Sequence, residues 1–225
     1  EASAEQKLAA YDRLLTPDSS VEKKRLVLSG LAEIAHPEAF RLALEQMDDE
    51  AAREEATIAA VAIANTLGEN AQQDSAFINT SSIDGWEGAA PYWRFEEGLI
   101  VGGSDDPVEK TTYLWTPESV GDFYLRVAVK LEPNTGNSGV QFRTENRGGE
   151  AYGYQADIGK DVWGRIYDQG GRAKLDWTGR AEEAVKPGEW NAYEILAIGP
   201  AIWTAINGKL GVACLDITAE AEAAG

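Results

Sequence analysis

Apolar positions in the first third of the chain repeat with the spacing of an amphipathic helix. They recur every three or four residues in successive short segments, which are separated by residues that start or stop helices. Pro37, for example, stands where a first helical turn tolerates proline. One apolar stripe contains Val21, Leu28, Leu31 and Ile34. The pattern predicts four helices, over residues 3–15, 21–35, 37–47 and 50–66.

The third and fourth predicted helices are organised like a helical repeat. In HPEAFRLALEQMDDEAAREEATIAAVAIAN a short helix started by proline precedes an alanine-rich one, which resembles a pair of HEAT-type repeats. Two units are fewer than a solenoid needs for independent stability, so we expect the helices to lean on the rest of the chain. Their expected role is packing, or docking onto a protein partner. The sole histidine, His36, is interpreted as a helix-boundary residue.

Beyond Gln73 the hydrophobic period falls to two, as in β-strands. In GDFYLRVAVKLEP, alternate apolar residues from Phe123 to Leu131 share one face. Asn207-Gly208 between two apolar runs is the strongest short-range signal of a hairpin. We therefore predict an α+β multidomain chain that ends in an antiparallel β-sandwich or jelly roll. Its expected parts are a helical domain at 1–70, a linker at 71–76 and the sandwich or jelly roll at 77–225.

Composition and charge narrow the possible partners. Only two of the 23 glycines and none of the seven tryptophans precede residue 70, where the period also changes. The net charge of −18 disfavours binding to nucleic acid or to an anionic membrane surface. No apolar run approaches the ~20 residues of a membrane span.

The single cysteine, Cys214, excludes an internal disulfide. The start EASAEQ, without a methionine, favours an exported or periplasmic protein over a cytoplasmic one.

Three consecutive strand-like segments, NSGVQFRTE, GYQADIG and VWGRIYD, carry the candidate chemistry. If they pair as a meander, their alternation places polar and aromatic side chains together on one sheet face. Amide, carboxylate and guanidinium groups can bind sugar hydroxyls, and aromatic rings can stack on the C–H face of a pyranose. The alternative is a solvated face with cross-strand Arg–Asp pairs. The expected set is Gln141, Arg143, Gln155, Asp157, Trp163, Arg165 and Tyr167.

Carboxylates on this face are scarce. A conventional glycosidase needs two, either ~5 Å or ~6.5–9.5 Å apart, and Asp157 is the one clear candidate. Asp168 has the parity of the buried face but could turn into the site from a strand end. With only one histidine, far away in the helices, a Ser-His-Asp triad or a His-rich metal site is excluded here. No cofactor is expected, although loop carboxylates such as Asp105 and Asp106 could hold Ca²⁺ without matching a specific loop.

Several motifs, in order, carry a family resemblance: IDGWEG, WRFEEGLIVGG, GDFYLRVAVKLE, GNSGVQFR, GYQADIG with WGRIYD, and PGEWNAYEILAIGPAIWTAING. Together, over roughly residues 77–216, they resemble the 3-keto-disaccharide hydrolase family. The resemblance implies a concanavalin A-like jelly roll whose polar face lines the ligand groove. It also implies an oxidised saccharide as substrate, with a ketone at C3. That ketone acidifies the C2 hydrogen, so that a base removes it, the C1 substituent leaves, and water adds.

The resemblance, with the face parity, suggests roles for individual residues. Asp157 would be the base, Arg143 and Gln141 the donors to the enolate or hydroxyls, and Asp168 an acid. The remaining expected ligand contacts are Asn137, Gln155, Trp163, Arg165 and Tyr167. Family members continue with strands carrying a glutamine, a histidine and an arginine, whereas this sequence ends at DITAEAEAAG, which predicts that the closing strands are missing. A second interpretation is therefore a non-catalytic glycan- or protein-binding module, an accessory subunit docked on a larger assembly.

Overall fold

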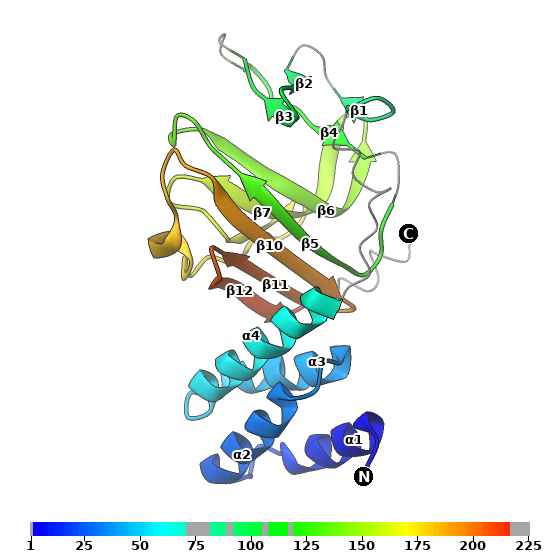
Figure 1. Ribbon diagram of the computed structural model, residues 1–225, viewed down its shortest axis with the longest axis vertical. Helices are drawn as coiled ribbons and strands as arrows, with labels where there is room; N and C mark the ends of the chain where they lie inside the picture. The colour runs from blue at the N-terminus through cyan, green and yellow to red at the C-terminus, as the bar shows by residue number, and fades with distance from the viewer. Residues whose placement is uncertain (1, 71–81, 89–91, 105–107, 117–118, 217–225) are drawn as a thin grey trace.

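The computed structural model describes residues 2–70, 82–88, 92–104, 108–116 and 119–216. It has three layers, of which the helices form the first (Figure 1). The helices are α1 (Ala4–Leu14), α2 (Val21–Ala32), α3 (Pro37–Glu45) and α4 (Arg53–Asn70), with the 3-10 turn η1 (Gln46–Asp48) before α4. The four predicted helices are thus confirmed, while their kinship with HEAT repeats stays a prediction.

Side-chain caps start the first three helices. The Ser3 hydroxyl accepts from the amide of Gln6 at 3.3 Å, and the Ser20 hydroxyl accepts from the amide of Lys23 at 3.3 Å. His36 Nδ1 accepts from the amide of Glu38 at 3.1 Å, directly before Pro37 at the first turn of α3. The interpretation of His36 as a helix-boundary residue is confirmed.

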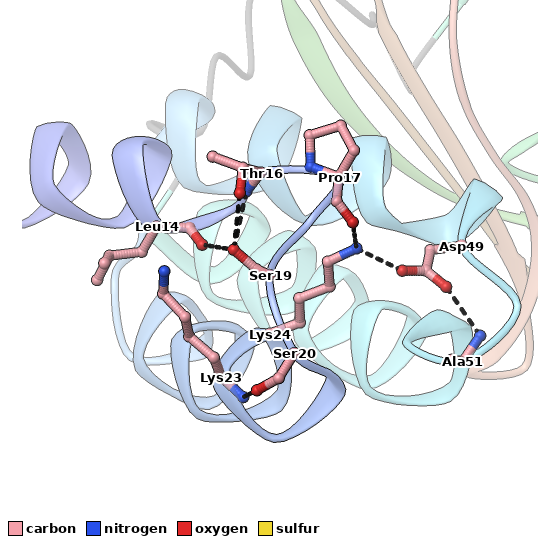
Figure 2. Close-up of polar contacts among 9 residues, drawn as sticks. All are labelled: Leu14, Thr16, Pro17, Ser19, Ser20, Lys23, Lys24, Asp49 and Ala51. Carbon is pink, nitrogen blue, oxygen red and sulfur yellow. Dashed lines mark hydrogen bonds and ion pairs between the residues drawn. The ribbon is translucent and has the colours of Figure 1, made fainter.

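A buried lysine joins two loops of the helical layer. Lys24 on α2 is only 5% exposed, and its Nζ donates to Asp49 Oδ2 at 2.6 Å and to the Pro17 carbonyl at 3.4 Å (Figure 2). Asp49 Oδ1 also accepts from the amide of Ala51 at 3.0 Å. Because a buried ammonium needs a partner, this ion pair holds the α1–α2 loop against the turn before α4. The hydrogen bond from Lys24 keeps the pKa of Asp49 below its usual value.

Two four-stranded antiparallel sheets form the other two layers. The first has the order β12-β11-β10-β5 and the second the order β6-β7-β8-β9. Their strands are β5 (Phe123–Val129), β6 (Asn137–Arg147), β7 (Glu150–Gly159), β8 (Ile166–Gln169), β9 (Ala173–Asp176), β10 (Asn191–Ile198), β11 (Ala201–Ile206) and β12 (Lys209–Leu215). The 3-10 turn η2 (Glu182–Ala184) lies between β9 and β10. The predicted antiparallel β-sandwich is confirmed.

Two small antiparallel sheets lie at the end of the molecule opposite the helices (Figure 1). One pairs β1 (Glu87–Gly88) with β4 (Leu114–Trp115), and the other pairs β2 (Trp93–Glu96) with β3 (Leu99–Gly102). The predicted hairpin at Asn207-Gly208 joins β11 to β12, and both of its residues have positive φ, 51° and 79°. Such values suit the tight turns that match strand twist.

Most residues of β10, β11 and β12 are buried on both faces of the first sheet, whereas β5 at its edge is partly exposed. Between the two sheets, a core forms around Phe142, Tyr154, Trp163, Ile166, Tyr193, Ile195 and Ile202. On the face of this sheet that is turned toward the helices, Leu196, Trp203 and Leu210 pack with buried helical residues, including Leu28 and Phe40. One continuous hydrophobic core therefore joins the helical layer to the sandwich. The domain limits stay a prediction, and the expected linker lies outside the described residues.

Gly68 lies inside the last helix. The fourth helix was predicted to end at residue 66, but α4 continues through Gly68 to Asn70. A Cβ at this position would lie 2.5 Å from the ring of Tyr124, which projects from β5 toward the helices. Close packing of helix against sheet, rather than helix termination, explains this glycine.

Candidate functional site

A polar row crosses all four strands of the second sheet on the face turned away from the core. In the strand register, Gln141 lies opposite Gln155, Gln155 opposite Tyr167, and Tyr167 opposite Lys174. Directly opposed residues of antiparallel strands share one face. Their neighbours Phe142, Tyr154, Ala156 and Ile166 fill the core on the other side. The predicted meander and the convergence of Gln141, Gln155 and Tyr167 are present.

Side-chain amides link this row to a carboxyl group. Gln141 Nε2 donates to Gln155 Oε1 at 2.6 Å, and Gln155 Nε2 donates to Asp157 Oδ1 at 2.6 Å. Gln169 continues the row: its Oε1 lies 3.5 Å from Gln141 Nε2, and its Nε2 donates to the Tyr113 hydroxyl at 3.0 Å. Tyr113 directly precedes β4, so one small sheet reaches the polar face. Gln169 has the same strand parity as Tyr167, a signal that the sequence already contained.

Asp157 is buried in this row, with 3% of its surface exposed. Its Oδ2 has no hydrogen-bond partner among the described residues. Burial raises the pKa of Asp157 to about 6, although the hydrogen bond from Gln155 and the charge of Arg165 act in the lowering direction. The backbone here is fixed, because the Asp157 amide donates to the Arg165 carbonyl at 2.9 Å and its carbonyl accepts from the Tyr193 hydroxyl at 3.2 Å.

The strand opposite Asp157 contributes little side-chain volume. Gly139 is its register partner, and a Cβ there would lie 2.5 Å from Cγ of Gln155. The glycine therefore leaves space for the Gln155 amide to reach Asp157. Asn137, which lies opposite Gly159 at the start of β6, is exposed. Its expected contact with ligand stays a prediction.

Aromatic and cationic side chains meet at the β8–β9 end of the row. The rings of Tyr167 and Trp177 are 6.0 Å apart at an interplanar angle of 67°. Arg165 Cζ lies 5.4 Å, and Lys174 Nζ 4.8 Å, from the centroid of Trp177. Trp177 was not predicted from the sequence. It follows the end of β9 at Asp176, and the register shift between Ile166 and Tyr167 in the β8–β9 pair interrupts the alternation of faces there.

Arg143 does not join the row. It has a positive φ of 48° and lies at the β6 irregularity between Phe142 and Glu145, which turns its side chain toward the other sheet. Its Nη1 donates to the Gly199 carbonyl at 2.5 Å, and its Nη2 lies 3.1 Å from Asp122 Oδ1. The expectation that Arg143 faces the ligand is therefore corrected to a role in joining the two sheets.

Trp163 also differs from its expected position. It was expected to face outward, but only 1% of it is exposed and it packs in the core between the sheets. The strand begins at Ile166, and the preceding turn contains Asp161 and Gly164 at φ values of 66° and 75°, so alternation does not apply there. Its Nε1 donates to Asn134 Oδ1 at 3.4 Å.

Asp168 is likewise removed from the polar row. It lies opposite the core residue Tyr154, and its Oδ2 accepts from the amide and Nε of Arg172 at 3.0 and 2.7 Å. Arg172 also pairs with Asp216 at 2.6 Å. The strand parity was right, and the ion pair prevents Asp168 from turning outward as a second site carboxylate. Asp105 and Asp106 lie outside the described residues, so calcium binding there stays a prediction.

The second sheet thus carries an amide and aromatic row beside one buried carboxyl group. The family model described as the 3-keto-alpha-glucoside-1,2-lyase-like domain matches residues 73–224, so the protein is a carbohydrate-active, hydrolase-like protein, and the chain belongs to this family. A candidate glycosyl hydrolase of known structure from Parabacteroides distasonis is similar at 21% identity and a TM-score of 0.46. That similarity covers 61% of this chain and 70% of the other. No curated protein matches the sequence. None of the described helices has the length and apolar character of a membrane span.

Proposed function

We propose that the protein cleaves the glycosidic bond of saccharides that carry a ketone at C3, by elimination across C1 and C2. The observation that carries the proposal is the buried carboxyl of Asp157, whose Oδ1 is occupied by Gln155 and whose Oδ2 has no partner among the described residues. One oxygen is thus held and the other is free to take a proton. The family description, which names a 3-keto-glucoside lyase, supports the same chemistry.

The reaction needs one base and a stabilised enolate. The C3 ketone acidifies the C2 hydrogen, which Asp157 Oδ2 removes, and the C–H electron pair forms the enolate. The enolate then re-forms the ketone, the C1=C2 double bond forms, and the C1–O bond breaks. The departing oxygen takes a proton from the newly protonated Asp157 or from water. Addition of water across C1=C2 completes net hydrolysis.

The neighbouring groups fit the remaining roles. A base with a pKa of about 6 is close to the value that serves proton transfer near neutral pH. Gln141 and Gln155 have amide hydrogens that are not used in their contacts with each other. These hydrogens and the guanidinium of Arg165 can donate to hydroxyls and to the enolate oxygen. Tyr167 and Trp177 supply the aromatic wall for the sugar ring. This set replaces the expected roles of Arg143, Trp163 and Asp168.

A second candidate function is a binding module without catalysis, docked through its helices. The observation that favours it is the scarcity of acid–base groups, since Asp168 is committed to its ion pair with Arg172. Leu26 on α2 and Ile58 on α4 are 76% and 61% exposed and could contribute to such docking. This candidate predicts saccharide binding without chemical change.

Proton NMR of the protein with a 3-keto-disaccharide in deuterated water tests the proposal. We expect loss of the anomeric signal with exchange at C2, and Asp157→Asn should slow both by about 10²- to 10⁴-fold. Asp161→Asn is the matched control, because Asp161 is exposed in the turn after β7 and asparagine tolerates its positive φ. Undiminished turnover by Asp157→Asn would assign the base elsewhere. Binding without any spectral change would favour the second candidate.

A further inference from the structure

Two cationic side chains converge on one indole ring in a protein with a net charge of −18. Lys174 Nζ and Arg165 Cζ lie 4.8 and 5.4 Å from the centroid of Trp177. Within the described ranges, neither cation takes part in an ion pair. The nearby basic residues Arg172 and Arg180 are both paired with aspartates, so this arrangement differs from its surroundings.

The two cations differ in how far their charge is compensated. Arg165 lies close enough to Asp157 and Glu182 to act on the pKa of both in the lowering direction. Its Nε is nevertheless buried without a hydrogen-bond partner among the described residues. Gly179 has a φ of 69°, and a Cβ there would lie 2.6 Å from Arg165 Nη2, so this glycine makes room for the guanidinium.

Lys174 is exposed, and no acidic group among the described residues pairs with its charge. The acid two positions along β9, Asp176, is already occupied, because it pairs with Arg180 at 2.9 Å and accepts from the Thr178 hydroxyl at 2.7 Å. The ammonium instead lies on the Trp177 ring. A cation held on an indole keeps its hydrogen-bond donors directed outward, where they can reach a ligand.

The strand register places this cation at a defined distance from Gln155, whose amide holds the proposed base Asp157. Gln155 lies opposite Tyr167, and Tyr167 lies opposite Lys174, so two strand spacings separate Gln155 from Lys174. At about 4.8 Å for each spacing, the separation is about 10 Å. A sugar ring bound beside Asp157 would therefore leave Lys174 facing the next unit of the saccharide.

We propose that Arg165, Lys174 and Trp177 bind an anionic group, a carboxylate or a sulfate, on the unit that adjoins the 3-keto ring. The inference rests on the proposed function and specifies its substrate class as acidic saccharides. Lys174 supplies the charge that attracts the anion, Trp177 holds the ammonium in place, and Arg165 extends the donors toward Asp157. A neutral saccharide would occupy the amide row and the aromatic wall without using the charge of Lys174.

Steady-state kinetics with three matched 3-keto-disaccharides test this assignment. The first is neutral, the second carries a C6 carboxylate on the adjoining ring, and the third carries a C6 sulfate there. We expect kcat/KM about tenfold or more higher for an anionic substrate, the size of a charge-assisted hydrogen bond. Added sodium chloride should reduce the preference. Comparison of the carboxylate and sulfate substrates shows which of the two anionic groups the protein prefers.

Variants of Lys174 separate its charge from its bulk. Lys174→Gln should abolish the preference by raising KM for the anionic substrates while leaving kcat nearly unchanged, and Lys174→Arg should retain the preference. Lys23→Gln, an exposed lysine on α2, makes the same change of net charge far from the sheet and should have no effect. Equal kcat/KM for neutral and anionic substrates, or a preference that survives Lys174→Gln, would overturn the inference alone. Absence of both turnover and calorimetric binding for all three substrates would overturn the proposed function as well.

Discussion

Gln155 Nε2 donates a 2.6 Å hydrogen bond to Oδ1 of Asp157, two residues further along β7 on the same face. The contact orients a carboxyl group that is almost fully buried and assigns different roles to its two oxygens. Oδ1 is held by the amide, while the buried Oδ2 has no hydrogen-bond partner among the described residues. The hydrogen bond also favours the charged form, and so opposes part of the effect of burial on the pKa.

The first prediction concerns the pH dependence of turnover. A base must be deprotonated, so kcat/KM should fall about tenfold for each pH unit below about 6 and level off above it. Gln155→Leu removes a hydrogen bond that lowers the pKa of Asp157, and should therefore move this inflection to higher pH. A pH–rate profile of both proteins measures the effect. If the inflection does not move in the variant, the titrating group in the pH–rate profile is not Asp157.

The second prediction concerns stability. Burial raises the pKa of Asp157 from an ordinary ~4 in the unfolded chain to about 6, so the folded protein binds this proton more tightly. The contribution of Asp157 to stability is therefore most favourable below pH ~4 and declines as pH rises to about 6. At pH 7, Asp157→Asn should raise the free energy of unfolding by about 1–3 kcal/mol, and should therefore unfold at a higher temperature than the unsubstituted protein. At pH 4 the two proteins should be equally stable.

Thermal unfolding at the two pH values measures that difference, with Asp161→Asn as the control for a surface carboxylate. A variant that is less stable than the unsubstituted protein at pH 7 would contradict the prediction. We therefore expect Asp157→Asn to stabilise the fold while it slows the proposed chemistry.

A third prediction tests the contact between α4 and β5. Replacing glycine by alanine inside a helix is ordinarily favourable by roughly 0.5–1 kcal/mol. At Gly68 the new Cβ would meet the ring of Tyr124, so Gly68→Ala should instead destabilise the protein by about 1–3 kcal/mol. Chemical denaturation measures the change. Tyr124→Leu in the same chain should relieve the loss, and a stabilising Gly68→Ala would show that helix and sheet are not in close contact here.

A fourth prediction separates Arg143 from the candidate site. Its side chain is 2% exposed and joins the Gly199 carbonyl to Asp122. Arg143→Gln should lower stability by about 1–3 kcal/mol, because it removes the donor to the partly buried Gly199 carbonyl. The KM and kcat of the folded variant should stay unchanged. Arg147→Gln, at the exposed end of the same strand, is the control with little expected effect on either. A selective loss of kcat would return Arg143 to the site.

The strands that contribute Gln141, Gln155 and Asp157 could be placed from sequence because alternation is uninterrupted between Asn137 and Phe142 and along β7. Where the backbone departs from the regular strand, parity failed. The irregularity after Phe142 turned Arg143 to the opposite sheet, and the shift between Ile166 and Tyr167 brought Trp177 onto the polar face. An extra residue in one strand reverses the face of all that follow, and such bulges have no dependable sequence signal.

The near-complete burial of Asp157 could not be inferred from alternation either. It depends on how the turn from Gly159 to Arg165 folds back, and the positive φ values of Asp161 and Gly164 set that path. The helices, in contrast, followed their periodicity and caps closely. Gly68 is the exception, because its place inside α4 is decided by Tyr124, a residue far away in sequence.

The burial of β10, β11 and β12 on both faces of the first sheet determines how this chain can be handled in the laboratory. Cutting it after α4 would leave Leu196, Trp203 and Leu210 in contact with water as one apolar surface. Surfaces of this kind cause proteins to aggregate. A sandwich produced without residues 1–70 would therefore precipitate or capture unrelated proteins, and its inactivity would say nothing about the polar face on the far side. Studies of the saccharide chemistry require the helices, even though these pack against the first sheet and Asp157 lies in the second.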